Sequence, residues 1–113
     1  MATSGLNGPY NLTGPGILAA VTRNGMPGAY ALGRLNNDNV FEISYVGRSD
    51  SDIAARLQNW VGSYHHFKFD YFGTAAAAFA KECQLYHDFN PPDNKVHPAT
   101  PVNSNVKCPV CRT

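Results

Sequence analysis

The chain has 113 residues, which is enough for one compact domain with a modest core. Hydrophobic residues make up 43% of it and charged residues 15%, a balance that excludes a fibrous protein and a highly charged disordered segment. The formal net charge of +1 excludes a strongly basic protein that coats nucleic acid nonspecifically, although local basic patches remain compatible with binding.

The sequence also bears on location. No stretch approaches the roughly 20 apolar residues that span a bilayer, and the N-terminal residues lack the basic and apolar segments of a signal peptide. We therefore expect a soluble, cytoplasmic protein with no membrane partner. In a reducing compartment, its three cysteines favour a metal site or free thiols over a disulfide scaffold.

Glycine and proline are frequent at the beginning of the chain. We expect residues 1–26 to form a flexible arm, with at most one short ordered piece at 17–21. Alternating residues then predict strands at 28–34 and 40–47. The turn-forming residues 36–39 lie between these strands, so the pair is predicted to form a hairpin.

The next predicted elements are a helix and a third strand. The helix is expected to be capped by Ser49 or Asp50 and to run to about Gly62, and the strand covers 66–72. Four residues of this helix form a stripe that is predicted to face the core, namely Ile53, Leu57, Trp60 and Val61.

The last predicted element is a long helix. Thr74 supplies an N-cap, 75–89 is a strong helical run, and two prolines end it. Residues 95–113 contain three further prolines and are predicted to form an irregular tail. The expected domain is 27–94, an α+β fold of order β-β-α-β-α with a small three-stranded, mainly antiparallel sheet flanked by helices.

Two tyrosines flank the predicted hairpin. If the turn centres between Asn37 and Asp38, Tyr30 lies directly opposite Tyr45, with Cβ atoms about 5 Å apart. A β-bulge would shift this pairing. Tyrosine is also a favoured strand residue, so each one alone is compatible with an ordinary structural role.

Glu82 interrupts the apolar face of the long helix. An unpaired buried carboxylate is costly, so Glu82 is expected to face a metal ion or an arginine. Arg56 is the natural protein partner, and a surface ion pair between Arg56 and Asp52 is the alternative.

Five sequence features form an ordered series: Pro27-Gly28-Ala29-Tyr30, Tyr45-Val46-Gly47, Arg56, Glu82 and Asn94. The series resembles the signature of the GIY-YIG endonuclease superfamily over residues 27–94. The spacing from the glutamate to the asparagine is similar to that in the catalytic domain of the bacterial excision-repair incision subunit.

The resemblance implies hydrolysis of a DNA phosphodiester with one divalent metal ion, Mg²⁺ or Mn²⁺, in a DNA repair or restriction setting. It implies that Glu82 binds the metal and that Tyr30 is the general base. Arg56 would bind the phosphate, Tyr45 would orient water or phosphate, and Asn94 would fix the local loop.

Three basic residues are candidates for contacts with the DNA backbone, namely Arg48, Lys68 and Lys81. Trp60 occupies a position where members of the superfamily often carry His or Tyr. A catalytically inactive module that binds nucleic acid or a partner therefore remains an alternative. The sequence does not distinguish a monomer from a homodimer.

The C-terminal pair Cys108-x-x-Cys111 supplies half of a tetrahedral zinc site. Cys83 and His87, four apart on one helical face, are candidates for the other half, and His97 is a competing ligand. Such a site would tie the tail to the long helix. The alternatives are free thiols, or a zinc-stabilised interaction domain without DNA affinity.

Overall fold

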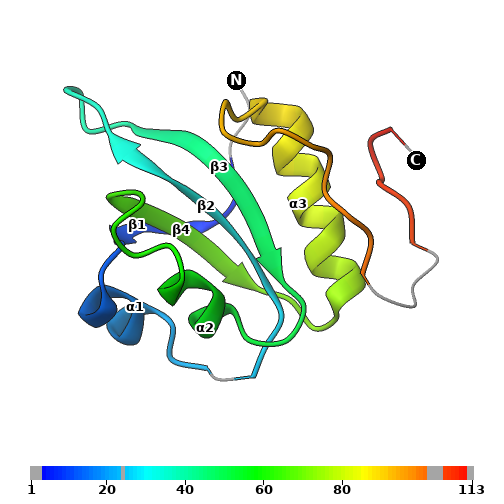
Figure 1. The fold of residues 1–113 in the computed structure, drawn as a ribbon, viewed down its shortest axis with the longest axis horizontal. Coiled ribbons are helices and arrows are strands. Elements are labelled where there is room, and N and C mark those ends of the chain that lie inside the picture. The colour runs from blue at the N-terminus through cyan, green and yellow to red at the C-terminus, as the bar shows by residue number, and fades with distance from the viewer. Residues whose placement is uncertain (1–3, 24, 102–105, 112–113) are drawn as a thin grey trace.

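The computed structural model describes residues 4–23, 25–101 and 106–111. The protein is a compact α+β domain built on one antiparallel sheet, whose four strands have the order β1-β4-β2-β3 (Figure 1). In chain order the elements are β1 (Asn7–Asn11), α1 (Gly14–Ala20), β2 (Gly28–Leu35), β3 (Phe41–Ser49), α2 (Ile53–Gln58), β4 (His66–Tyr71) and α3 (Ala75–Phe89).

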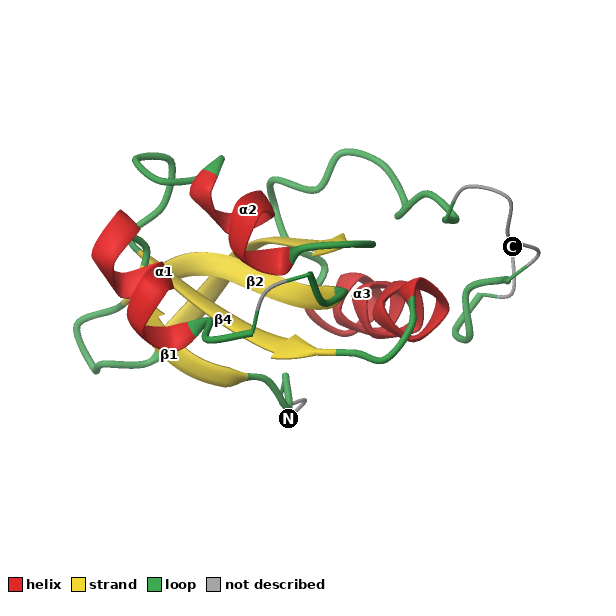
Figure 2. Ribbon diagram, turned by 90° about the horizontal axis from the view of Figure 1, so that it is seen from below, coloured by secondary structure: helices red, strands yellow, loops and turns green. Residues whose placement is uncertain are grey.

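The two faces of the sheet are covered by different helices. Figure 2 shows α1 and α2 together on one side of the sheet. On the other side, Leu85 of α3 packs against Ala31 of β2 and Val46 of β3. Within the described part of the chain, no helix combines the length and the apolar character needed to cross a bilayer.

The first strand and helix correct the expected three-stranded sheet. β1 pairs with β4 as a fourth strand, and Ile17 of α1 is fully buried in the core together with Leu12 and Val21. The expected arm allowed one ordered piece at 17–21, whereas the structure has both a strand at Asn7–Asn11 and a helix at Gly14–Ala20. The glycines and prolines of this segment suggested a flexible arm. Its strand and helix depend on contacts with β4 and α2, which are distant in sequence.

The β2–β3 hairpin has approximately the predicted strands but a different register. Tyr30 pairs with Gly47, and Tyr45 pairs with Leu32, so the two tyrosines are not directly opposite each other. Next to the turn, Leu35 already pairs with Phe41 and not with Val40, and a bulge between Leu32 and Gly33 shifts the pairing further. Because side chains alternate between faces, Tyr30 and Tyr45 remain diagonal neighbours on the α1/α2 side.

Gly33 is required at this bulge, because a Cβ there would overlap the carbonyl oxygen of Glu42. We expect Gly33→Ala to lower the free energy of unfolding by about 1–3 kcal/mol, the usual cost of overpacking. Urea denaturation measures this loss. Gly73→Ala is the matched control, because a Cβ there meets no described atom within 4 Å, and its change should stay within about 0.5 kcal/mol. Equal stability of the two variants would contradict the close approach at the bulge.

α2 is shorter than expected. Its N-cap is Asp52, whose side chain accepts a hydrogen bond from the amide of Ala54, and it ends at Gln58 instead of near Gly62. Ser49 does not cap the helix but accepts hydrogen bonds from the amides of Ser51 and Asp52, so it shapes the turn between β3 and α2.

α3 confirms the predicted long helix and its cap. The Thr74 hydroxyl accepts a hydrogen bond from the amide of Ala77, and Asn90 ends the helix in the left-handed conformation. The chain then passes along β3, where the amide of Asp93 donates to the carbonyl of Ser44. The described residues that follow, 94–101 and 106–111, lie beside α3 and have no helix or strand, as expected (Figure 1).

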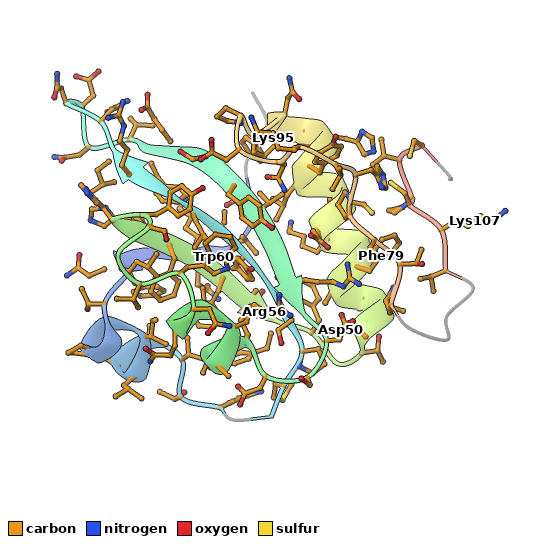
Figure 3. All side chains as sticks on the ribbon, in the orientation of Figure 1. Asp50, Arg56, Trp60, Phe79, Lys95 and Lys107 are labelled. Carbon is orange, nitrogen blue, oxygen red and sulfur yellow. The ribbon has the colours of Figure 1, made fainter. Side chains whose placement is uncertain are left out.

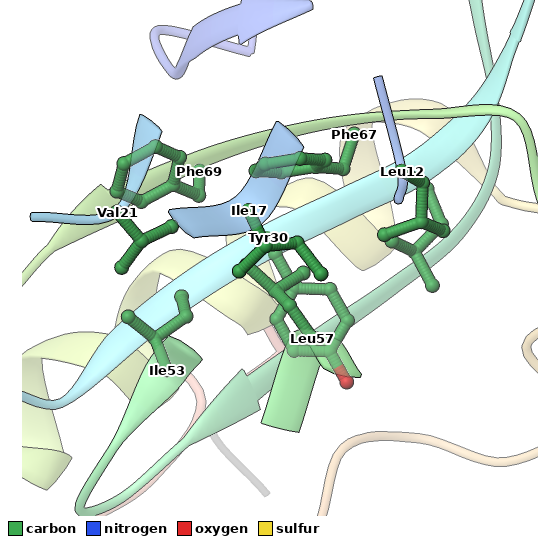
Figure 4. Packing of buried hydrophobic residues seen from close by; sticks show 9 residues of the cluster. Leu12, Ile17, Val21, Tyr30, Ile53, Leu57, Phe67 and Phe69 are labelled. Carbon is green, nitrogen blue, oxygen red and sulfur yellow. The ribbon is translucent and has the colours of Figure 1, made fainter. Parts of the chain in front are cut away.

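Tyr30 belongs to the main hydrophobic cluster on the α1/α2 side of the sheet, shown in Figure 4. The ring is only 1% exposed. The position of the Tyr30 phenol is therefore fixed by the core itself. The cluster consists of Leu12, Ile17, Val21, Tyr30, Leu32, Ile53, Leu57, Phe67 and Phe69.

Candidate active site

An open pocket of about 290 Å³ lies where the ends of β2 and β3 meet α2 and α3. Tyr30, Tyr45, Arg56 and Glu82 all line it, so each of four elements contributes one of the predicted site residues. Figure 3 shows Arg56 and Asp50 in the region between α2 and α3. The remaining lining residues are Gly47, Arg48, Ser49, Asp50, Ser51 and Ala99.

Trp60 organises the two tyrosines. Its indole Nε1–H donates a hydrogen bond of 2.9 Å to the Tyr30 hydroxyl, and its ring packs against Tyr45 at a centroid distance of 4.8 Å. An indole nitrogen only donates, so the Tyr30 hydroxyl uses an acceptor lone pair here and its own proton is directed elsewhere. This contact was missed in the sequence, where Trp60 looked like the loss of a functional side chain.

Both phenols are protonated in the free protein. Burial raises the pKa of Tyr30 well above its ordinary value, although the hydrogen bond from Trp60 and the charge of Arg56 act to lower it. Burial and the nearby Glu82 carboxylate likewise raise the pKa of Tyr45. Any chemistry that needs a phenolate must therefore bring positive charge into the pocket or operate at alkaline pH.

Gly47 allows the Tyr30 phenol to reach the pocket. A Cβ at this position would lie 2.5 Å from the Tyr30 hydroxyl oxygen and 2.6 Å from the ring carbon that bears it. Contacts this short are not found in proteins, so a larger residue would displace the ring. The glycine of Tyr45-Val46-Gly47 thus has a steric role across the strand pair.

Glu82 is paired with Arg48, not with Arg56 as expected. The distance between Arg48 Nη1 and Glu82 Oε1 is 2.7 Å, and Arg48 Nε lies 2.7 Å from Asp50 Oδ1. The Arg48 guanidinium also stacks over the Phe79 ring at 5.2 Å. The end of β3 lies against α3, and this packing brings Arg48 to the glutamate.

The Arg48–Glu82 pair is well shielded from water. The side chains of Arg48 and Glu82 are 11% and 10% exposed. Burial raises the pKa of Glu82 above its ordinary value, although Arg48 acts to lower it. Because Arg48 serves as this structural partner, its guanidinium is not a free surface charge of the kind expected to follow DNA.

Arg56 is exposed at the pocket and forms no ion pair within the described residues. The alternative pair with Asp52 is not formed, since the Asp52 side chain caps α2. Arg56 therefore offers uncommitted N–H donors beside Tyr30 and Tyr45, whose pKa values it acts to lower.

Asn94 lies outside the pocket lining and supports it from the edge of β3. Its side-chain amide accepts a hydrogen bond from the Val46 amide at 2.8 Å and donates one to the Val46 carbonyl at 3.0 Å. The side chain thus pairs with the strand edge as a neighbouring backbone would. These contacts fix the loop after α3 against the strand that carries Tyr45.

The other two candidate DNA contacts, Lys68 and Lys81, do not line the pocket. The Lys68 ammonium lies over the Phe41 ring at 5.4 Å, and the Lys81 ammonium lies close to Gly5. Neither contact adds positive charge to the pocket.

A second polar cluster lies between α3 and the C-terminal segment. The ligand atoms of His87, His97, Cys108 and Cys111 all lie within 4.8 Å of one another. Cys83, expected as a ligand, is not in this group and packs with Phe79 and Cys108 in a small apolar cluster. Its place is taken by the competing candidate His97.

The environments of the two buried thiols differ. Burial raises the pKa of Cys83 to about 12. Burial also acts to raise the pKa of Cys108, but hydrogen bonds with the amides of Cys111 and Val110 and with the side chains of His97 and Cys83 together lower it to about 6. Cys108 therefore ionises to a thiolate more readily than Cys83 does.

The fold and site define an α+β domain with an open polar pocket formed by two phenols, two guanidinium groups and two carboxylates. No protein-family model matches the sequence, and no curated protein or solved structure matches it significantly.

Proposed function

We propose that the protein is a metal-dependent DNA endonuclease of the GIY-YIG type. The proposal is carried by the convergence of Tyr30, Tyr45, Arg56 and Glu82 on one pocket. These residues lie far apart in the chain, on four different elements.

Glu82 suits a hard divalent cation. Only its Oε1 atom is engaged by Arg48, and Oε2 has no protein partner within the described residues. Mg²⁺ is commonly bound through one or two carboxylates, with water and substrate phosphate completing its octahedral shell. Glu82 would therefore bind Mg²⁺ or Mn²⁺, and the ion would neutralise charge that develops on the phosphate during cleavage.

Three other side chains would bind the phosphate, accept the proton and orient the reacting groups. Arg56 has free N–H donors that would bind non-bridging phosphate oxygens and fix the scissile group beside the phenols. After losing its own proton to solvent, Tyr30 Oη would take a proton from the water that attacks phosphorus, while the bond from phosphorus to the leaving oxygen breaks. The Trp60 N–H and Arg56 both favour the phenolate. Tyr45 would orient water or phosphate from the adjacent strand.

Nicking of supercoiled plasmid DNA in the presence of Mg²⁺ tests this proposal. We expect Glu82→Gln to lower the nicking rate more than tenfold, a loss of at least about 1.4 kcal/mol of transition-state stabilisation. Glu42→Gln is the matched control, because Glu42 is an exposed glutamate of β3 that does not line the pocket, and this variant should nick at the rate of the unchanged protein.

Two outcomes would reject the endonuclease. One is equal nicking by the unchanged protein and Glu82→Gln. The other is failure of the unchanged protein to cleave double-stranded, single-stranded and branched DNA, each tested with Mg²⁺ and with Mn²⁺.

A DNA-binding module without turnover is the second candidate. It is favoured by the Arg48–Glu82 ion pair, which neutralises the carboxylate, and by the burial that keeps Tyr30 protonated. This candidate predicts DNA binding that weakens with salt and that Arg56→Gln reduces, without any cleavage. Fluorescence anisotropy with labelled DNA at several salt concentrations measures that binding.

A further inference from the structure

The cluster formed by His87, His97, Cys108 and Cys111 has the dimensions of a tetrahedral metal site. His87 Nε2 and His97 Nε2 are 3.3 Å apart, and Cys111 Sγ lies 3.4 Å from His97 Nε2. Zinc bonded to nitrogen at about 2.0–2.1 Å and to sulfur at about 2.3 Å places two nitrogens about 3.4 Å apart, and nitrogen and sulfur about 3.6 Å apart. Both observed distances agree to within a few tenths of an ångström.

The hydrogen bond at the far side of the His97 ring prepares its Nε2 atom as a ligand. Nδ1 lies 2.9 Å from the Pro98 carbonyl oxygen, which only accepts, so Nδ1 carries the proton. In the neutral ring, Nε2 is then an unprotonated nitrogen that faces both His87 and Cys111. A metal-bound histidine commonly donates a hydrogen bond from its other ring nitrogen to a backbone carbonyl in this way.

The two cysteines have the spacing and environment of a zinc knuckle. Cys108 and Cys111 are separated by two residues, and the amides of Val110 and Cys111 donate to the Cys108 sulfur. The donor set of two imidazoles and two thiolates suits Zn²⁺ far better than Mg²⁺, which prefers oxygen.

The described C-terminal residues 106–111 contact α3 through a small apolar cluster, against which Val106 also packs. Within 106–111, Cys108 is the buried residue, and it packs with Phe79 and Cys83 of α3. Residues 106–111 have neither helix nor strand, so a metal ion would add order to a segment without regular backbone structure. His97 lies two residues before Ala99, which lines the pocket, so the same site would steady one wall of that pocket.

We propose that His87, His97, Cys108 and Cys111 bind one structural Zn²⁺ that fastens the C-terminal segment to α3. All four coordination positions are filled by protein atoms, which is characteristic of structural zinc sites. The proposal is independent of the endonuclease function, since none of the four residues lines the pocket.

Metal analysis of the purified chain tests the site directly. After refolding with Zn²⁺ and gel filtration, elemental analysis should find one zinc per chain in the unchanged protein and a loss of most of it in His97→Gln and Cys111→Ser. His65→Gln is the matched control for histidine, because His65 is exposed and outside the cluster, and it should retain one zinc.

Cobalt substitution counts the thiolates and checks Cys83. Tetrahedral Co²⁺ gives visible absorption bands, and thiolate-to-cobalt charge transfer in the near ultraviolet grows with the number of sulfur ligands. Cys111→Ser should lower that charge-transfer absorption to about half, whereas Cys83→Ala should leave it unchanged. If the buried Cys83→Ala variant does not fold, as judged by circular dichroism, titration of the unchanged protein against two-thiolate and three-thiolate reference peptides gives the same count.

Three results would overturn the site. These are the absence of stoichiometric zinc after refolding, full retention of zinc by both His97→Gln and Cys111→Ser, and three-thiolate absorption in the unchanged protein. None of these measurements involves DNA cleavage, so they separate failure of the zinc site from failure of the endonuclease.

Discussion

Tyr30→Phe is expected to lower the rate of plasmid nicking by about 100- to 10,000-fold, the usual contribution of a general base. The substitution removes only the hydroxyl, so the ring keeps its packing in the core and across Gly47. The Trp60 N–H loses its acceptor, but Trp60 is only partly buried, and water can replace the lost hydroxyl. The fold should therefore survive, as circular dichroism and thermal unfolding would show.

Tyr64→Phe is the matched control for this substitution. Tyr64 belongs to the same aromatic group, with its ring centroid 6.0 Å from that of Trp60, but its hydroxyl donates to Asp93 and does not line the pocket. Its nicking rate should match that of the unchanged protein. Equal loss of nicking in both variants would show that the aromatic cluster matters only for structure.

The pH dependence of nicking provides a second readout for Tyr30. Burial raises the pKa of its phenol, so the phenolate is the minor form throughout the neutral range. At pH values below that pKa, the phenolate fraction increases about tenfold for each unit by which the pH rises. The nicking rate should rise with the same slope. In Tyr30→Phe this rise should disappear, whereas a structural role would lower the rate without changing the slope.

Local signals were sufficient for much of the fold. Alternation and turn chemistry predicted the hairpin, and the Thr74 cap with its alanine-rich run predicted α3 within its observed bounds. The bulge at Gly33 was not predictable in the same way, because it arises from the approach of Glu42 across the strand pair. β1 and α1 were missed for a related reason, since their order depends on distant contacts.

The site shows the same division between local and distant information. Burial of Glu82 correctly predicted that it needs a cation, but the packing of β3 on α3 selected Arg48 in place of Arg56. Spacing along one helical face favoured Cys83 as a ligand beside His87. The path of the tail after α3 brings His97 there instead, and short-range spacing contains no information about that path.

Arg48→Met is expected to lower the free energy of unfolding by about 3–5 kcal/mol at neutral pH, the usual cost of leaving a buried charge without its partner. The Arg48 and Glu82 side chains are both about nine-tenths buried, so water cannot replace the guanidinium effectively. Urea denaturation measures the loss. Arg34→Met is the matched control, because it breaks the exposed Arg34–Glu42 pair at 3.5 Å and should cost less than about 1 kcal/mol.

Lowering the pH should restore part of the stability that the Arg48→Met variant loses. Burial already raises the pKa of Glu82, and loss of the guanidinium raises it further. A carboxyl whose folded pKa is raised favours folding below its unfolded pKa, and this contribution is lost as the pH rises through the folded pKa. The deficit of Arg48→Met should therefore shrink between neutral pH and about pH 5.

The double variant Arg48→Met/Glu82→Leu, which removes both charges, should recover most of the stability at neutral pH. A deficit that is independent of pH and persists in the double variant would mean that Arg48 contributes through its contact with Phe79 and not through Glu82.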